Sequence, residues 1–415
     1  MAATSAAALA PIVRQPTAVK SRCARSPDRP DASRRESLAR DDRSVGSLRG
    51  EDIHRASPSP SPTRALAIDR PPGSPPPRRA LARLSRVRDR RKSVRVSAGP
   101  RAVVHAVAPA KKAFFFPGQG AQSVGMAGEL CEECPAAKAL FDEASEILGY
   151  DLLDVCVNGP AEKLNSTEVS QPAIYVASLA ALEKMKSTPE GAAEIDAVDV
   201  CAGLSLGEYT ALTFAGAITF ADGVKLVKLR GESMQAAADA TKSGMASVIG
   251  LAADKVDELC AAASEQSGEP VQIANYLCNG NYAVSGSEAA VDKVAEIAKP
   301  EFKARMVVKL AVAGAFHTDF MAPAAEALKA GLADTPIAET RIPVISNVDV
   351  EPHADADAVR ETLAKQLTSP VQWEKTMQTL LEGGLETSTE VGPGKVISGI
   401  MKRIDKKAVC ENFTV

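Results

Sequence analysis

The chain has 415 residues, of which 45% are apolar and 24% are charged, and its formal net charge is −3. This is about three times the length of a typical domain, which argues against one compact unit. The small net charge is a sum over two unlike parts. Residues 1–101 contain 23 lysines and arginines against 9 acidic residues, a net of +14, whereas residues 102–415 contain 26 against 43, a net of −17.

Residues 1–108 are predicted to be a disordered leader. All 16 aromatic residues of the chain lie at or beyond Phe114. A basic, Pro-rich stretch without aromatic residues cannot bury enough apolar surface to offset the entropy of ordering it. Its Arg- and Ser-rich composition indicates a transit peptide that is removed on entry into an organelle. The competing hypothesis is a basic tail that binds nucleic acid or an anionic surface.

Membrane, disulfide and metal classes are not favoured. No apolar run reaches the roughly 18 residues that a membrane-spanning helix needs. Eight cysteines in 415 residues are too few for a disulfide scaffold. The only CxxC motif joins Cys131 and Cys134, and a zinc ribbon needs a second such pair. We therefore expect two thiols on one turn of an exposed helix, a reducing compartment and no metal.

Beyond residue 113, short apolar runs alternate with helical patterns, which predicts a parallel α/β sheet. In such a sheet the catalytic groups lie on loops at the carboxyl ends of the strands. The expected elements are strands at 114–116 and 197–203, a helix from about Leu206, a helical stretch from about Val224 that ends near Arg230, a return strand at 343–347, and helix on both sides of Pro370 within 363–381.

A different pattern occupies residues 243–312. Strands are expected at 245–250, 271–278, 282–285 and 303–312, with helices at 252–267 and 288–299. The order βαββαβ is the ferredoxin-like arrangement. We therefore predict a ferredoxin-like small domain, 243–312, inserted into a large α/β domain that is formed by 109–242 and 313–415.

Ser205 is the predicted nucleophile. It lies in the sequence Gly-Leu-Ser-Leu-Gly at 203–207, a GxSxG motif between a predicted strand and a predicted helix. A tight strand-to-helix turn exposes the serine hydroxyl, and the two glycines relieve the crowding in the turn. The amino end of the helix also supplies a backbone N–H, that of Leu206, for a developing oxyanion.

A serine nucleophile needs a base, and only two histidines lie beyond Val107. His317 follows an apolar stretch where the chain leaves the small domain. His353 lies in an acidic polar loop that offers nothing to shape a pocket. His317 is therefore the predicted base.

Two further features set this sequence apart from a general serine hydrolase. Arg230 is one of five arginines after position 101, and a guanidinium can bind a carboxylate with two parallel hydrogen bonds. A surface salt bridge with Glu232 or Asp222 is the alternative role for this arginine. Gln119 lies in a Gly-rich turn after the first strand, which can direct a backbone or amide N–H toward the end of a second strand. Phosphate binding, or a turn without a functional role, are the alternatives for such a loop.

With these residues in view, residues 113–415 resemble the malonyl-CoA:acyl carrier protein transacylases. The resemblance rests on six motifs in order: FPGQGAQ, GLSLGEY, LRGESMQ, GAFH, SPVQW and EVGPGK. It implies an α/β-hydrolase-like large domain with an inserted ferredoxin-like domain. Two positions depart from common family forms: Leu204 stands where many members have His, and Gly314 replaces the first His of HAFH, a form associated with malonyl rather than methylmalonyl choice.

The resemblance also implies roles for individual residues. Ser205 matches the acylated nucleophile, His317 the base, and Arg230 the group that binds the malonyl carboxylate. Gln119 and the backbone N–H of Leu206 match the oxyanion hole. Gln372 matches a residue whose main chain orients the histidine.

The implied reaction is transfer of malonyl from malonyl-CoA to the phosphopantetheine thiol of acyl carrier protein, in fatty acid biosynthesis. No bound cofactor, metal, nucleic acid or membrane is expected, and the chain is expected to act as a monomer in the chloroplast stroma, with the mitochondrion as the alternative. Because the carrier protein in such systems is acidic, a local basic cluster is expected to form part of the docking or phosphate-contacting surface: Lys395, Lys402, Arg403, Lys406 and Lys407. A solvated face of a terminal helix is the alternative for this cluster. A serine esterase or thioesterase with the same Ser–His pair, or a binding module without catalysis, are the other hypotheses.

Overall fold

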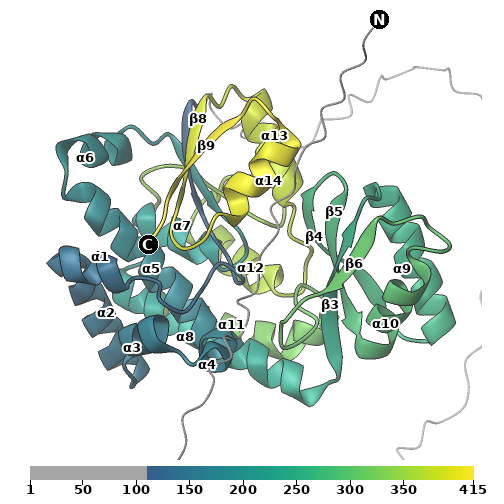
Figure 1. Cartoon of the computed structure of the whole chain (residues 1–415). Helices are drawn as coiled ribbons and strands as arrows, with labels where there is room; N and C mark the ends of the chain where they lie inside the picture. Colours follow the sequence, from purple (N-terminus) through teal and green to yellow (C-terminus); the bar gives the residue numbers. More distant parts are fainter. Residues whose placement is uncertain (1–109) are drawn as a thin grey trace, which may run out of the picture. The chain divides into compact units, whose positions relative to one another are not determined.

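The structure, a computed structural model, describes residues 110–415. Its larger part is built on a five-stranded sheet in which every neighbouring pair is parallel, with the strand order β7-β2-β1-β8-β9 (Figure 1). The strands are β1 (Lys112–Phe116), β2 (Val200–Gly203), β7 (Val344–Ile345), β8 (Thr387–Val391) and β9 (Val409–Phe413).

The central strand β1 shows why helices cover both faces of this sheet. Successive side chains of a strand point to opposite faces. Phe114 and Phe116 accordingly belong to one apolar core, whereas Phe115 belongs to a second core on the other face, where its ring packs edge-on against Trp373. A strand buried on both faces reads as a continuous apolar run, as this one does.

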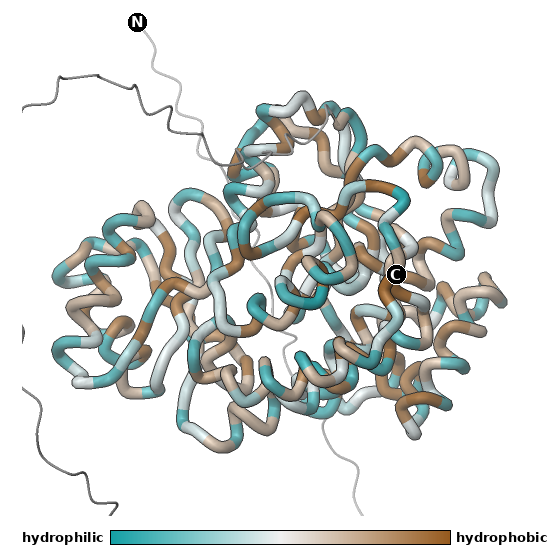
Figure 2. Tube along the Cα trace, turned by 180° about the vertical axis from the view of Figure 1, so that it is seen from behind, coloured by the Kyte–Doolittle hydropathy of each residue, from teal (hydrophilic) through white to brown (hydrophobic). Residues whose placement is uncertain are grey.

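The helices of the larger part pack on these two faces. The helices α5 and α8 pack against each other, and α5 is buried on nearly every side. In Figure 2, hydrophobic and hydrophilic residues alternate along the outer helices, as expected where one face of a helix lies on the core. These elements are α1 (Gly128–Glu133), α2 (Pro135–Leu148), α3 (Leu152–Asn158), α4 (Ala161–Asn165), α5 (Thr167–Lys186), α6 (Pro189–Asp196), α7 (Gly207–Phe214), α8 (Phe220–Ala240), η1 (Asp319–Met321), α11 (Ala322–Asp334), α12 (Ala356–Gln366), α13 (Trp373–Glu382) and α14 (Val396–Ile404).

A second, antiparallel sheet has the strand order β4-β5-β3-β6 and packs two helices on one face. Its chain order is βαββαβ, so the ferredoxin-like expectation is confirmed. Backbone hydrogen bonds join it to the larger part, from Tyr276 to Val371 and from Val371 to Ala274. The elements are β3 (Ser243–Ile249), α9 (Ala253–Ser267), β4 (Val271–Cys278), β5 (Asn281–Ser287), α10 (Glu288–Ile297) and β6 (Met306–Lys309).

Some expectations differ from this structure. The helix that carries Arg230 begins at Phe220 and continues to Ala240, so Arg230 lies in its middle and not at its end. The strands β8 and β9 were not expected. The proposed boundaries at 242 and 313 stay a prediction, and the leader at 1–108 lies outside the described residues.

The CxxC expectation is wrong in one respect. Cys131 and Cys134 are 6% and 5% exposed, so both thiols are buried. Burial raises the pKa of Cys131 to about 11, so its side chain is a protonated thiol at neutral pH and a poor nucleophile or metal ligand. The seven cysteines of the described residues are all free and buried. None of the helices at 110–415 is long and apolar enough to cross a membrane.

Candidate active site

Ser205 lies in the turn that joins β2 to α7. Its φ of 52° is in the left-handed region, which bulky residues rarely adopt. A Cβ on Gly207 would collide with the carbonyl of Phe116, and one on Gly203 would collide with the backbone of Gly207. The two glycines therefore permit the tight turn that presents the Ser205 hydroxyl, as the motif predicts.

His317 is the partner of Ser205. Its Nε2 lies 2.9 Å from the Ser205 Oγ, and its Nδ1 lies 2.8 Å from the backbone oxygen of Gln366. A carbonyl oxygen only accepts, so Nδ1–H donates to Gln366 and the Nε2 lone pair faces the serine. This tautomer is the one that can remove the serine proton.

The pKa of His317 is lowered to about 4, because the ring is buried and because the positive charge of Arg230 lies nearby. A histidine with this pKa is neutral throughout the physiological range. His317 can therefore accept a proton without first losing one.

Arg230 projects from the middle of α8 into the site and is 1% exposed. Its Nη1 donates to the Gln171 Oε1 at 2.7 Å, and its Nη2 donates to the Ser205 Oγ at 3.0 Å and to the Gln366 Oε1 at 2.9 Å. Its Nε is buried and has no hydrogen-bond partner among residues 110–415. The alternative of a surface salt bridge is wrong, because within residues 110–415 the guanidinium contacts no carboxylate.

The predicted oxyanion donors lie beside the serine. Leu206 precedes the first turn of α7, and its backbone N–H donates to no acceptor of the described part of the chain. Gln119 follows β1, and its turn lies against the nucleophile turn: the Leu204 N–H donates to the Phe116 oxygen at 3.0 Å, and a Cβ on Gly118 would strike the Leu204 oxygen. The side-chain Nε2 of Gln119 makes only a long contact, 3.5 Å to the Thr167 Oγ1. Their catalytic role stays a prediction.

The expectation for Gln372 is corrected. Its backbone N–H donates to the Asn347 oxygen at 2.8 Å, and it is the residue before α13. The carbonyl that His317 contacts belongs to Gln366, six positions earlier, at the end of α12. The last carbonyls of a helix have no partner within it, so a helix that ends before Pro370 offers such an acceptor. The proline at position 370, which limits the preceding helix, was the feature of the sequence that pointed to this acceptor.

The expectation for His353 is also corrected. Its side chain is 1% exposed, and its Nε2 lies 2.8 Å from the Oε1 of Glu208, which is fully buried. His353 is therefore not a solvated loop residue. It contacts Glu208 and not Ser205, so the choice of His317 as the partner of the serine agrees with the geometry.

Together, fold and site define a serine acyl-transfer enzyme, in which a histidine lies within hydrogen-bond distance of a serine at the carboxyl end of a parallel strand. Within residues 110–415 no group of His, Cys, Asp or Glu could hold a metal ion. The profile of the family described as acyl transferase domain matches residues 113–410.

Individual relatives narrow this class. The malonyl CoA-acyl carrier protein transacylase of Bacillus subtilis is 42% identical over 300 residues, which are 72% of this chain and 91% of that protein. The malonyl-CoA-acyl carrier protein transacylase of Homo sapiens, named as mitochondrial, is 39% identical over 304 residues, 71% of this chain and 77% of that protein. A solved structure of a malonyl-transacylase in complex with its type II PKS acyl-carrier protein has a TM-score of 0.68 and 35% identity, and covers 73% of this chain and 95% of that chain. The chain belongs to the malonyl CoA-acyl carrier protein transacylase family and is an acyltransferase.

Proposed function

We propose that this chain transfers the malonyl group of malonyl-CoA to the phosphopantetheine thiol of an acyl carrier protein, through a malonyl ester on Ser205. One observation carries the assignment. Arg230 is a buried cation that contacts no carboxylate in the described part of the chain, and it donates to the hydroxyl of Ser205. A buried unpaired charge is costly, so the site is suited to an acyl group that brings its own carboxylate.

In the first half-reaction the Ser205 Oγ attacks the thioester carbon while its proton moves to the Nε2 of His317. The new bond is Oγ–C, and the bond that breaks joins this carbon to the sulfur of CoA. The proton on His317 then passes to the departing thiolate. The N–H groups of Leu206 and Gln119 stabilise the oxyanion, and each such donor typically lowers the barrier by about 3 kcal/mol.

In the second half-reaction the thiol of the carrier protein gives its proton to His317, and its sulfur forms a bond with the carbonyl carbon of the malonyl ester. The bond between this carbon and the Ser205 Oγ then breaks, and the Oγ recovers the proton from His317. The kinetics are therefore ping-pong. The proton and acyl movements need no metal and no bound cofactor. Water must be kept from the ester, since its attack would release malonate.

The experiment that tests this function follows labelled malonyl from malonyl-CoA. Transfer of the label to holo acyl carrier protein is expected, together with a malonyl adduct on the intact enzyme by mass spectrometry. Label that appears in free malonate would favour the esterase alternative. The absence of any adduct would favour a binding module and would contradict the proposal.

The pKa of His317 predicts an unusual pH profile. The base is neutral above pH about 4, so kcat/KM for malonyl-CoA is expected to stay level from pH 8 to about pH 5. Because kcat/KM reports the free enzyme, its acidic limb should be centred near pH 4, well below 6.5. A limb centred at 6.5, the ordinary value for histidine, would contradict this assignment.

The same shift has a consequence for stability. The pKa of His317 is lower in the folded than in the unfolded chain, so the unfolded chain binds more protons between pH 4 and 6.5. The contribution of His317 to stability is therefore present above pH 6.5 and decreases as the pH falls through this window.

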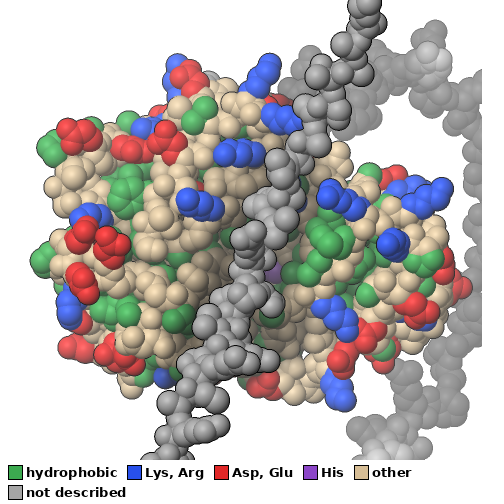
Figure 3. Space-filling view, viewed as in Figure 1, with side chains coloured by type: hydrophobic (Ala, Val, Ile, Leu, Met, Phe, Trp, Pro, Cys, Tyr) green, Lys and Arg blue, Asp and Glu red, His purple; other side chains and the backbone are tan. Residues whose placement is uncertain are grey.

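Carrier-protein docking is proposed to use the basic cluster Lys395, Lys402, Arg403, Lys406 and Lys407, all of which are exposed on or beside α14. Lys and Arg side chains gather over the region of α13 and α14 in Figure 3. The partner is supported by the solved complex of a related transacylase with its carrier protein. Because residues 102–415 carry −17, attraction to an acidic partner needs such a local patch.

Reversing the charges of Lys402 and Arg403 to Glu is expected to raise KM for the carrier protein about tenfold at low salt, while malonylation by malonyl-CoA is less affected. The control reverses Lys138 and Lys186, which are also exposed and change the net charge by the same amount, and each of which pairs with an acidic residue of its own helix. An unchanged KM with an unchanged salt dependence would contradict this docking site.

We further propose that the enzyme is a monomer of the chloroplast stroma, with the mitochondrion as the alternative. The basic, Ser-rich composition of residues 1–108 supports an organelle transit peptide. The relative named as mitochondrial supports an organelle without deciding which one. Import of a reporter fused to 1–108 into isolated plastids and mitochondria would distinguish them.

A further inference from the structure

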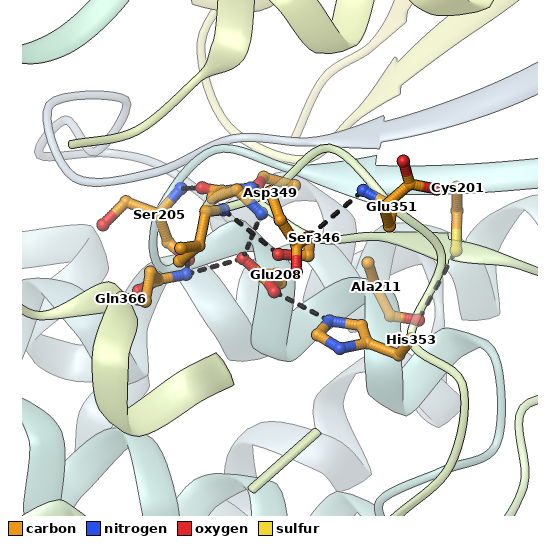
Figure 4. A network of polar contacts seen from close by, with 12 residues as sticks. Cys201, Ser205, Glu208, Ala211, Ser346, Asp349, Glu351, His353 and Gln366 are labelled. Carbon is orange, nitrogen blue, oxygen red and sulfur yellow. Dashed lines mark hydrogen bonds and ion pairs between the residues drawn. The ribbon is translucent and has the colours of Figure 1, made fainter. Parts of the chain in front are cut away.

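Behind the nucleophile turn lies a buried carboxylate that the mechanism does not use. Glu208 lies in the first turn of α7, three positions after Ser205, and is fully buried. Three groups donate to it: the Nε2 of Gln366 at 2.7 Å, the Nε2 of His353 at 2.8 Å and the backbone N–H of Asn347 at 3.1 Å. Figure 4 shows Glu208 between Gln366 and His353.

The contact with Gln366 fixes the direction of that amide. Its Nε2 donates to Glu208 and to the Ser205 backbone oxygen at 3.0 Å. Its Oε1 therefore faces Arg230, where an acceptor is needed, while its backbone oxygen holds the ring of His317. If the side-chain amide of Gln366 were rotated by half a turn, its NH₂ group would face the Nη2 of Arg230, and two donors would then lie opposite each other. Arg230 would lose one of its acceptors.

The contact with Asn347 holds the turn itself. The Oδ1 of Asn347 accepts from the Ser205 N–H at 2.6 Å, and its Nδ2 donates to the Gly203 oxygen at 2.7 Å. The side chain of Asn347 thus binds both ends of the strained turn, and the backbone N–H of Asn347 donates to Glu208. The base, the guanidinium and the nucleophile all connect to this carboxylate through one intermediate residue.

The two oxygens of Glu208 are not used equally. Oε2 accepts from both Gln366 and Asn347, whereas His353 is the donor to Oε1 among residues 110–415. A buried oxygen that loses its donor keeps the desolvation cost. Without His353, the Glu208 carboxylate is therefore expected to rotate until Oε1 reaches another donor. This rotation would weaken the hydrogen bonds that Oε2 accepts from Gln366 and Asn347.

We propose that Glu208 and His353 are positioning residues for acyl transfer, which hold Gln366, and through it His317 and Arg230, in the reactive arrangement. Neither touches the reacting atoms. The inference rests on the proposed function, since it assigns these residues to the same malonyl transfer. It predicts that changes at His353 alter both the rate of Ser205 acylation and the preference for malonyl over acetyl.

The variants His353→Gln and His353→Asn test this. A pocket of about 270 Å³ borders His353 between Ala338 and Asp355, so a different polar side chain can be accommodated. The longer Gln can place an N–H near the Oε1 of Glu208, and the shorter Asn cannot. We expect His353→Asn to slow single-turnover malonylation about tenfold and to lower the malonyl-to-acetyl ratio about fivefold, with most of both restored in His353→Gln.

The control is Glu390→Gln. Glu390 is also fully buried and also binds backbone N–H groups, those of Ile397 and Ser398, but it has no link to Ser205. If it lowers the melting temperature as much as His353→Asn without changing the acyl ratio, the loss at His353 is specific.

Equal rates and ratios for His353→Asn, His353→Gln and the unmodified enzyme would overturn the proposal. If His353→Asn fails to fold, Glu208→Gln decides instead: it turns one acceptor oxygen into a donor, and an unchanged acyl ratio in this variant would also overturn the proposal. An unmodified enzyme that forms no malonyl adduct would instead refute the proposed function.

Discussion

Ser205→Ala is expected to abolish the malonyl adduct on the enzyme and to lower malonyl transfer by roughly five to six orders of magnitude, as when a serine nucleophile is removed elsewhere. The Oγ of Ser205 donates to the Nε2 of His317 and accepts from the Nη2 of Arg230. Without it, no ester can form and the two half-reactions are no longer linked. Intact-mass spectrometry after mixing with malonyl-CoA measures the adduct directly.

The matched control for this variant is Ser170→Ala. Ser170 is a buried serine of α5 whose hydroxyl has no partner within the part of the chain that the structure describes, so its loss removes no hydrogen bond there. It should keep both adduct and activity. A malonyl adduct of unchanged amount in Ser205→Ala would show that another residue is acylated, and the assignment of the nucleophile would then be wrong.

The fold was predictable where short apolar runs mark buried strands. The runs at 114–116 and 271–278 became β1 and β4, and the fold class is confirmed. The strand β8 escaped notice because its buried residues include Ser388, Thr389 and Glu390. A polar strand of this kind is recognised only through its partners, since the Glu390 carboxylate accepts from the first turn of α14.

The site was predictable as far as local motifs reach. A GxSxG turn and a count of histidines are enough for Ser205 and His317, which the structure places 2.9 Å apart. Glu208 and His353 were missed because charged residues are normally exposed unless paired, and this pairing spans 145 positions of the chain. Gln372 was predicted in place of Gln366 because the contact with His317 is made by a main-chain carbonyl, and the identity of a side chain does not show which carbonyl lies near a distant histidine.

Arg230→Ala is expected to lower kcat/KM for malonyl-CoA by roughly a hundredfold to a thousandfold, and to leave acetyl-CoA unchanged or to improve it. On the proposed function, the malonyl carboxylate pairs with a guanidinium that contacts no carboxylate of residues 110–415, whereas acetyl leaves this charge unpaired at a cost of about 3–5 kcal/mol. Removing the charge removes that discrimination. Rates of Ser205 acylation by the two thioesters measure it.

The comparison belongs at pH 8, because Arg230 also lowers the pKa of His317. Without the guanidinium that pKa should rise, so that at low pH a loss of neutral base would reduce both reactions and obscure the selectivity. Arg341→Ala is the matched control, since Arg341 binds the Phe214 oxygen and stands apart from Ser205. Equal losses for malonyl and acetyl at pH 8 would show that Arg230 supports the nucleophile without selecting the acyl group.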